Sequence, residues 1–222
     1  MIAQMVYDAV LTLAYPQACA ICGRSVEQRK FGVTCESCWA ADDADDLHDR
    51  VRGESHGFTV ARAAGFYEGA LRQAVLLLKR QPHIASHVVE LLVTAARREP
   101  LNTSTTIIPV PLHAERMRSR GFNQASVVAR ALSKSLRLPV DEVSLLRVSS
   151  SEQYRAGLDA RGRLETVSGA FEVSHPRLVA NEIVLLVDDV FTTGATVSAC
   201  AAALTGAGAR EVFVLTIARA RK

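Results

Sequence analysis

Two adjacent carboxylates stand between an apolar run and a turn rich in hydroxyl groups. The apolar run is Ile183–Val187, the carboxylates are Asp188 and Asp189, and the turn is Thr192–Thr196. Five consecutive apolar residues predict a strand that is buried on both faces, and the alanine-rich stretch after the turn predicts a helix. The two aspartates are therefore expected where the strand emerges from the sheet, and the turn is expected to open the helix.

The turn has the composition of a phosphate site. Backbone N–H groups at the start of a helix have no partner within the helix, and they lie at the positive end of its dipole. Small residues let a phosphate reach these groups, and hydroxyls add further donors. We assign the phosphate to five residues: Thr192, Thr193, Gly194, Ala195 and Thr196. Because carboxylates accept hydrogen bonds from vicinal sugar hydroxyls, Asp188 and Asp189 beside this turn predict a ribose 5-phosphate site.

Other common phosphate motifs do not fit. No lysine follows Gly194, so the segment is not a nucleoside-triphosphate P-loop, and the chain has no Gly-x-Gly-x-x-Gly for a dinucleotide. The alternative is a buried strand with a polar turn that binds nothing. That alternative requires two aspartates and three threonines to fall within nine residues by chance.

Four of the five cysteines form two Cys-x-x-Cys pairs, which are ligand spacing for a tetrahedral thiolate site. Cys19 and Cys22 are separated from Cys35 and Cys38 by twelve residues. Zinc is the expected occupant, and four sulfur ligands leave no position for a substrate water, so the metal is expected to be structural. Two disulfides or a redox role are the competing interpretations. The fifth, Cys200, is expected to be a small core residue.

Hydrophobic patterns predict alternating strands and helices. The expected strands are 61–67, 105–110, 140–147, 182–187 and 211–218, and the expected helices are 71–78, 84–95, 122–136 and 195–205. Such alternation predicts an α/β domain with a mainly parallel sheet and helices on both faces. Ligands then collect where strand ends meet helix starts, which is where the two aspartates are expected.

The N-terminal region is expected to form a separate small unit. Apolar residues within 1–15 recur at helical spacing, and this helix together with the cysteines makes a predicted unit of residues 1–55, which precedes a main domain of residues 56–222. Five aspartates crowd residues 42–49. No window approaches the roughly 18 apolar residues of a spanning helix and no export signal is recognisable, so we expect a soluble, cytoplasmic protein.

Several separated motifs resemble one known family. The segment 187–196 resembles the phosphoribosyl pyrophosphate (PRPP) motif of type I phosphoribosyltransferases. Together with the four cysteines, Pro109–Leu112, Arg118–Gln124 and Gly169–Phe171, it resembles the ComF family of competence-associated proteins. The resemblance implies a type I phosphoribosyltransferase-like fold with an N-terminal zinc knuckle, and PRPP bound with Mg²⁺.

The resemblance also implies roles for individual residues. Asp188 and Asp189 would bind the ribose hydroxyls as the catalytic pair, and residues 192–196 would hold the 5-phosphate. Lys79 matches a family lysine that could meet pyrophosphate, and Pro111 would line the pyrophosphate side; a surface lysine and a rigid strand end are the equal alternatives. Gln153 and Arg163 match a further family stretch, whereas Thr166 and Arg80 depart from the family pattern.

Basic residues are concentrated after the proline-rich segment. Residues 116–137 carry five arginines and one lysine, although the net charge of the whole chain is only +3. Arg116, Arg118 and Arg120 are expected in a loop before a helix, where they could close over pyrophosphate or contact nucleic-acid phosphates. Asn123 and Gln124 could cap that helix or touch substrate. Solvated surface positions are the alternative for these side chains.

Three functions remain open at this stage. One is Mg²⁺-dependent phosphoribosyl transfer to a nucleobase acceptor, with a role in DNA uptake or nucleotide metabolism. The second is a protein without turnover that binds single-stranded DNA or a nucleotide, although one tryptophan, four tyrosines and seven phenylalanines do not make an evident stacking platform. The third is a PRPP-sensing scaffold that meets other DNA-uptake proteins through the knuckle.

Overall fold

The computed structural model describes residues 16–41, 51–52, 57–148 and 169–221. Four sequence predictions lie outside these residues: the N-terminal helix, the acidic stretch 42–49, the family positions Gln153 and Arg163, and the departure at Thr166. No helix among the described residues is long and apolar enough to cross a membrane.

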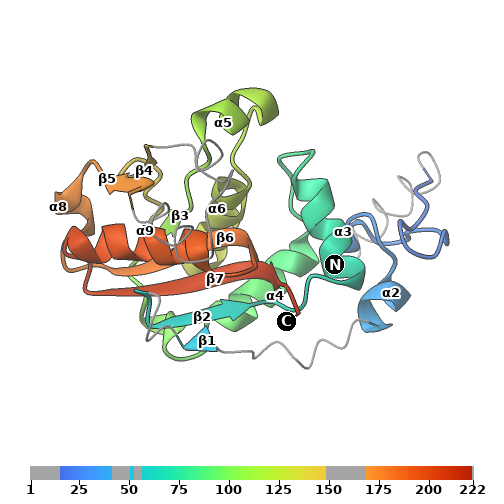
Figure 1. Cartoon of the computed structure of the whole chain (residues 1–222). Helices are drawn as coiled ribbons and strands as arrows, with labels where there is room; N and C mark the ends of the chain where they lie inside the picture. Colours follow the sequence, from blue (N-terminus) through green and yellow to red (C-terminus); the bar gives the residue numbers. More distant parts are fainter. Residues whose placement is uncertain (1–15, 42–50, 53–56, 149–168, 222) are drawn as a thin grey trace.

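A five-stranded sheet forms the centre of the molecule (Figure 1). Its strands follow the order β1 (Val51–Arg52), β2 (Val60–Ala63), β7 (Glu211–Arg219), β6 (Ile183–Phe191) and β3 (Thr106–Pro109). The last four strands are parallel, and only β1 is antiparallel to its neighbour. In register, Leu185 of β6 lies between Ile107 and Phe213. The predicted mainly parallel sheet is confirmed.

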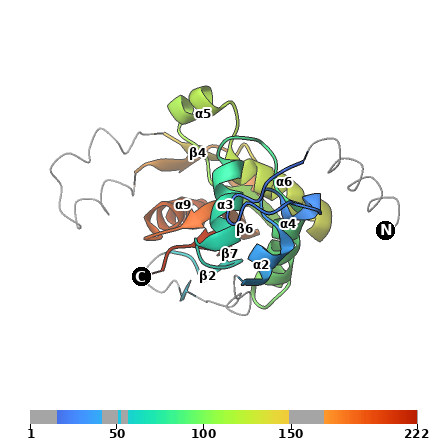
Figure 2. The same cartoon turned by 90° about the vertical axis from the view of Figure 1, so that its right-hand side faces the viewer.

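Helices cover both faces of this sheet. On one face lie α3 (Gly69–Leu78), α4 (Ser86–Ala96) and α6 (Gln124–Leu136), and on the other lies α9 (Ala195–Gly206), as Figure 2 shows. Leu185 and Val187 pack in the cluster under the first group, and Val184 and Leu186 pack in the cluster under α9. Alternate residues of β6 are therefore buried against opposite layers, which explains its unbroken apolar sequence.

A buried arginine closes the end of α4. Arg62 of β2 is only 7% exposed, and its guanidinium donates hydrogen bonds to the carbonyl oxygens of Ala95, Arg98 and Glu99. The last carbonyls of a helix have no partner within the helix and carry the negative end of its dipole. Backbone carbonyl oxygens therefore compensate the buried charge at least in part.

Smaller elements lie outside the five-stranded sheet. They are α5 (Ala114–Arg120), the antiparallel pair of β4 (Leu145–Arg147) and β5 (Phe171–Val173), and the short α8 (Pro176–Val179). Two sequence predictions are wrong here. Residues 114–120 form a helix, not a loop, because His113 caps its start and Gly121, at φ 77°, ends it. The strand expected over 140–147 is confined to its last three residues, because Asp141 holds the backbone of Val143 and Ser144 in a turn.

The cysteine segment packs directly against the helical layer. It contains a 3₁₀ turn (η1, Arg29–Phe31) and the helix α2 (Glu36–Ala41). The rings of Phe31 and Trp39 lie 5.0 and 4.8 Å from the ring of His87 in α4, both edge-on. Phe31 and Trp39 thereby belong to the same hydrophobic cluster as α3, α4 and α6. A second 3₁₀ turn, η3 (Leu101–Thr103), follows α4.

Candidate functional site

The two aspartates lie inside β6 rather than beyond its end. The expected strand end at Val187 is wrong, because β7 runs alongside and pairs with β6 as far as Phe191 and Arg219. Asp189 faces the α3 layer, where its Oδ2 lies 3.3 Å from Nζ of Lys79. Asp188 faces the α9 side, and its Oδ1 accepts a hydrogen bond of 2.8 Å from the backbone N–H of Asp189. The structure thus brings Lys79 to the aspartate pair from a position 110 residues away in sequence.

Asp188 is held in an environment that favours its protonated form. Burial, followed by the charge of Asp189, raises the pKa of Asp188 to about 7. The backbone N–H of Asp189 and the charges of Lys79 and Arg147 oppose this rise. A ligand that donates hydrogen bonds to this carboxylate would favour its ionised form, so the site is suited to hydroxyl donors.

The turn after β6 brings the backbone of Gly194 close to the ring of Phe191. Gly194 begins α9 with φ 80°, a conformation that glycine adopts without strain, and no side chain caps its helix start among the described residues. A Cβ at this position would lie 2.8 Å from Cζ of Phe191. Thr192 and Thr193 are exposed, and the Thr193 hydroxyl accepts from the N–H of Ala195 at 3.4 Å. Backbone N–H groups at a helix start of this kind can bind an anion such as phosphate.

Pro111 lines a cavity of about 650 Å³ beside the end of β3. The cavity is bounded by the α3–α4 loop, the α5–α6 junction and β4 (Leu145–Arg147). Asn123 fixes the junction: its Oδ1 accepts from the N–H of Ala125, and its Nδ2 donates to the carbonyl of Val110. Asn123 is therefore a helix cap, as one of the two sequence interpretations predicted. Gln124 is buried, and its amide nitrogen has no hydrogen-bond partner in the described part of the chain.

The arginines of α5 are not brought to the aspartates. Arg118 and Arg120 lie in the last turn of a helix that has no buried residue. Met117 and Gly121 line the 650 Å³ cavity, whereas the described lining includes neither Arg118 nor Arg120. Figure 1 shows α5 projecting away from the sheet. Their assignment to pyrophosphate stays a prediction.

Arg147, at the end of β4, is a site residue that the sequence analysis missed. Its charge lowers the pKa of Asp188, and its guanidinium lies 5.4 Å from the ring centre of Phe171 on β5. The same charge acts on Cys200, a fully buried thiol whose pKa is raised by burial and by Asp188. The available signal was a charged residue at the end of a predicted strand.

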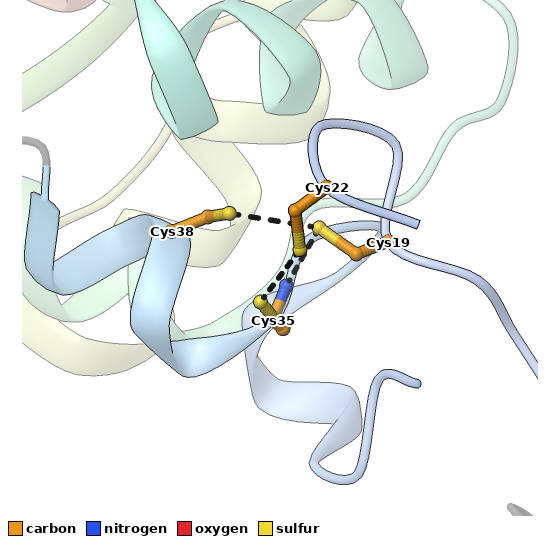
Figure 3. Close-up of side chains that lie close together, drawn as sticks. All are labelled: Cys19, Cys22, Cys35 and Cys38. Carbon is orange, nitrogen blue, oxygen red and sulfur yellow. Dashed lines mark hydrogen bonds between the residues drawn. The ribbon is translucent and has the colours of Figure 1, made fainter. Parts of the chain in front are cut away.

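The four paired cysteines converge on one point (Figure 3). Their sulfur atoms all lie within 4.8 Å of one another, with 3.8 Å between Cys19 and Cys38 and 3.6 Å between Cys22 and Cys35. Sulfurs bound to one zinc at about 2.3 Å in a tetrahedron are about 3.8 Å apart, so the spacing fits a metal and is far from the roughly 2 Å of a disulfide. The cluster can hold a metal such as zinc.

The surroundings of the four-cysteine cluster lower the pKa of some of its thiols and raise that of another. The side chain of Arg24 donates to Cys22 Sγ at 3.5 Å, and this contact is the main cause that lowers the pKa of Cys22 to about 6. Burial raises the pKa of Cys19, but backbone N–H groups outweigh it and leave that pKa lowered. Desolvation and the neighbouring thiols raise the pKa of Cys38 to about 12. A bound cation would offset the repulsion among the four thiolates.

Comparisons with known proteins identify the family of the chain. The phosphoribosyl transferase domain family matches residues 118–222. The DNA utilization protein YhgH of Salmonella typhimurium is 31% identical over 216 residues, which are 94% of this chain and 93% of that protein. Competence protein F of Haemophilus influenzae is 36% identical over 130 residues, and competence protein ComFC of Bacillus subtilis is 32% identical over 114 residues. The chain belongs to the ComF family.

The coverage differs among these ComF relatives. The alignment with competence protein F spans 57% of this chain and 55% of that protein, and the alignment with ComFC spans 51% and 44%. A solved structure of glutamine PRPP amidotransferase from B. subtilis, complexed with ADP and GMP, is 17% identical with a TM-score of 0.44. It covers 65% of this chain and 30% of that chain. The match to the phosphoribosyl transferase domain includes β6, the turn 192–196 and α9, so the predicted phosphoribosyltransferase-like fold is confirmed.

Proposed function

We propose that this ComF chain binds PRPP together with Mg²⁺ at the junction of β6 and α9. The ribose hydroxyls donate to Asp188 and Asp189, and the 5-phosphate lies on the turn 192–196. Lys79 meets the pyrophosphate. The observation that supports this most directly is the 3.3 Å contact of Lys79 with Asp189, beside a glycine-initiated helix start.

The proposed activity is transfer of the phosphoribosyl group in a step linked to DNA uptake. In such transfer the protein mainly positions the reactants and neutralises charge. Asp188 and Asp189 orient the ribose, Lys79 attracts the leaving pyrophosphate, and the turn fixes the far end of the sugar. When bound, Mg²⁺ would neutralise the negative charge that develops on the leaving pyrophosphate, and the carboxylates of Asp188 and Asp189 would hold it near the ribose. Asp188 and Asp189 supply the carboxylate oxygens that would accept hydrogen bonds from the ribose hydroxyls in such a complex.

Calorimetric titration of Mg²⁺–PRPP tests this proposal. The wild-type chain is expected to bind saturably, and a double variant, Asp188→Asn with Asp189→Asn, is expected to lose binding at least tenfold, since each lost charge-assisted hydrogen bond is worth about 1.5 to 3 kcal/mol. Glu172→Gln serves as a control because Glu172 is an exposed carboxylate on β5. Equal binding by the wild type and the double variant would contradict the proposal.

The four-cysteine cluster is proposed to hold one zinc ion as a structural centre. Its support is the sulfur spacing described above and the donation from Arg24 to Cys22. Native mass spectrometry is expected to show one zinc per chain. A folded, metal-free protein with two disulfides would overturn this assignment.

A second candidate function is contact with single-stranded DNA along α5. The arginines at 116, 118 and 120 of α5, of which the first two are exposed and the third is partly exposed, favour it, as do the names of the relatives, a competence protein and a DNA utilization protein. The affinity for an oligonucleotide should then fall steeply as the salt concentration rises. Replacing the three arginines with glutamine should reduce the slope of log K against log salt concentration by about two to three. Unchanged salt dependence in the triple variant would exclude α5 as the contact.

A further inference from the structure

The cavity that Pro111 lines is separate from the proposed PRPP site. It measures about 650 Å³, and its lining among the described residues includes neither the two aspartates nor Lys79. Its walls come from the α3–α4 loop, the α5–α6 junction, one face of α6 and β4, and we call it the α5–α6 cavity. Sites for small ligands usually have volumes of about 300 to 1,000 Å³. The α5–α6 cavity therefore has the size of a ligand site that PRPP binding does not use.

The α5–α6 cavity adjoins the edge of the sheet where the aspartates lie. Pro109 is the register partner of Val187, the residue before Asp188, and both Pro109 and Pro111 line the cavity. Adjacent strands of a sheet are about 4.8 Å apart. A ligand in the cavity would therefore lie next to PRPP without using the same carboxylates.

A phenylalanine ring lies among the apolar walls of the cavity. Phe122 is partly buried and lines the cavity together with Leu112 and Leu145. The backbone beside Phe122 is fixed, because Asn123 caps α6 and its Nδ2 donates to the carbonyl of Val110 at 2.9 Å. Nucleic-acid bases of every sequence stack on aromatic rings. The cavity thus has a fixed apolar surface on which a base can stack.

One face of α6 contributes polar groups to the cavity. Ser126, Arg130 and Lys134 are four residues apart and therefore lie on one side of the helix. Arg130 Nε and Nη2 donate to the two carboxylate oxygens of Glu142, at 2.9 and 2.6 Å. Lys134 is exposed and has no ion-pair partner among the described residues. Two cations against one carboxylate give the lining a formal charge of +1, with His83 neutral.

Further positive charge lies at the opposite end of the cavity, on α5. Met117 and Gly121 line the cavity, and their chain neighbours Arg118 and Arg120 are exposed and partly exposed, respectively. Figures 1 and 2 show α5 at the margin of the molecule, beyond α6 and β4. Because α5 leads into the start of α6 and Lys134 lies in its last turn, cations flank the apolar walls on two sides.

We propose that the α5–α6 cavity binds one nucleotide unit, with the base on Phe122 and the phosphates directed toward Lys134 and the arginines of α5. The inference rests on the second candidate function, the contact of α5 with single-stranded DNA, and adds the place where a base is held. A free nucleotide and a nucleotide within single-stranded DNA share this chemistry. The Ser126 hydroxyl and the pair of Arg130 with Glu142 supply donors and acceptors for the edge of the base.

The lining favours a nucleotide over simpler ligands. A purely apolar ligand would remove water from Lys134 and from the pair of Arg130 with Glu142 without replacing its hydrogen bonds, which is unfavourable. A phosphate alone would leave the ring of Phe122 uncovered. A base with phosphates attached meets the ring and the cations together, as sites for single strands do.

Fluorescence anisotropy of a labelled oligothymidylate with the full chain tests this inference. Phe122→Leu keeps an apolar side chain but removes the ring, so it should weaken binding about fivefold or more without changing the slope of log K against log salt concentration. Phe122→Tyr keeps the ring and should bind within about twofold of the wild type. Lys134→Gln should reduce the slope by about 0.7, which corresponds to one phosphate contact with a single strand.

Two competitors identify the source of the nucleotide. Displacement of the label by thymidine 5′-monophosphate supports a site for free nucleotides, and displacement only by unlabelled oligothymidylate supports a site for single-stranded DNA. An oligomer of abasic sites should bind more weakly and should not respond to Phe122→Leu, because it has no base to stack. Equal affinity for the abasic oligomer and for oligothymidylate would overturn the inference.

Arg210→Gln is the control for the loss of one positive charge, since Arg210 is exposed immediately before β7, at the opposite edge of the sheet. Its affinity and salt slope should equal those of the wild type. If the triple arginine variant of α5 loses oligonucleotide binding but Phe122→Leu and Lys134→Gln do not change it, the cavity is refuted and the α5 contact stands. If the wild type binds neither the oligonucleotide nor the mononucleotide, both are refuted.

Discussion

Replacing Asp188 with asparagine is expected to stabilise the protein while removing its ligand binding. Asp188 is a carboxyl group whose pKa lies far from its ordinary value: burial and the charge of Asp189 raise it from 3.8 to about 7. Asparagine has nearly the same shape, and its Oδ1 can still accept from the N–H of Asp189. The main effect of the variant is therefore to remove the free-energy cost of burying the charged carboxylate of Asp188.

The sign and size of the effect follow from the two pKa values. Because the folded pKa of Asp188 is raised above the unfolded one, folding favours the protonated carboxyl. Its contribution is fully present below about pH 4 and is lost as the pH rises through about 7. At roughly 1.36 kcal/mol per pH unit, the loss in the wild type is about 2 kcal/mol at pH 5 and about 4 kcal/mol at pH 8. We expect Asp188→Asn to raise the free energy of unfolding by about 2 to 4 kcal/mol at pH 8 and by distinctly less at pH 5.

Urea denaturation at the two pH values, followed by circular dichroism, measures this difference. For a chain of this size 2 to 4 kcal/mol corresponds to a rise in melting temperature of about 5 to 10 °C. Glu172→Gln, which neutralises an exposed carboxylate, should change stability by less than about 0.5 kcal/mol at either pH. A variant that gains equally at pH 5 and pH 8, or that loses stability at pH 8, would refute the argument that Asp188 carries a buried charge.

Three further changes test other parts of the structure. Gly194→Ala should destabilise the chain by about 1 to 2 kcal/mol in urea denaturation, because the residue has φ 80° and its Cβ would meet the Phe191 ring; unchanged stability would contradict the close approach. Arg62→Met should cost about 3 kcal/mol in the same assay, since three carbonyls at the end of α4 lose their donor, and a loss below 1 kcal/mol would show that water replaces it. Cys38→Ser, or removal of metal by a chelator, should lower the melting temperature and shift the emission of Trp39, the single tryptophan, to the red; intact folding without metal would refute a structural role.

The sequence predicted the parts of the site that are local in the chain. Five apolar residues, two aspartates and a glycine-containing turn follow one another, so the strand, the acids and the helix start could be placed without knowing the fold. The predicted helices agree with α3, α4, α6 and α9 to within about two residues at each end. This agreement is expected where one face of each helix enters the core at regular spacing, as Leu71, Val75 and Leu78 do in α3.

The parts that the sequence did not predict depend on contacts across the fold. Lys79 was singled out only through the family resemblance, as a residue that could meet pyrophosphate. Its contact with Asp189 was not predicted, because no local pattern joins residues so far apart. Arg147 gave only a weak signal, since a single charged residue near a strand end is common on protein surfaces. The end of β6 was placed too early because pairing with β7, rather than the composition of β6, decides where that strand stops.

The α3–α4 hairpin gives a physical reason for joining a four-cysteine unit to this domain. One end of α3 presents Lys79 to Asp189, while α2 packs against α3 and the rings of Phe31 and Trp39 hold His87 of α4. These contacts share one hydrophobic cluster with the sheet, so the hairpin is fixed from the cysteine side as well as from the site side. Because metal binding adds its free energy to folding, an occupied cysteine cluster would stabilise the layer that positions Lys79. The cysteine cluster can then lie far from the ligand and still help to hold the charge of Lys79 in place for ligand binding.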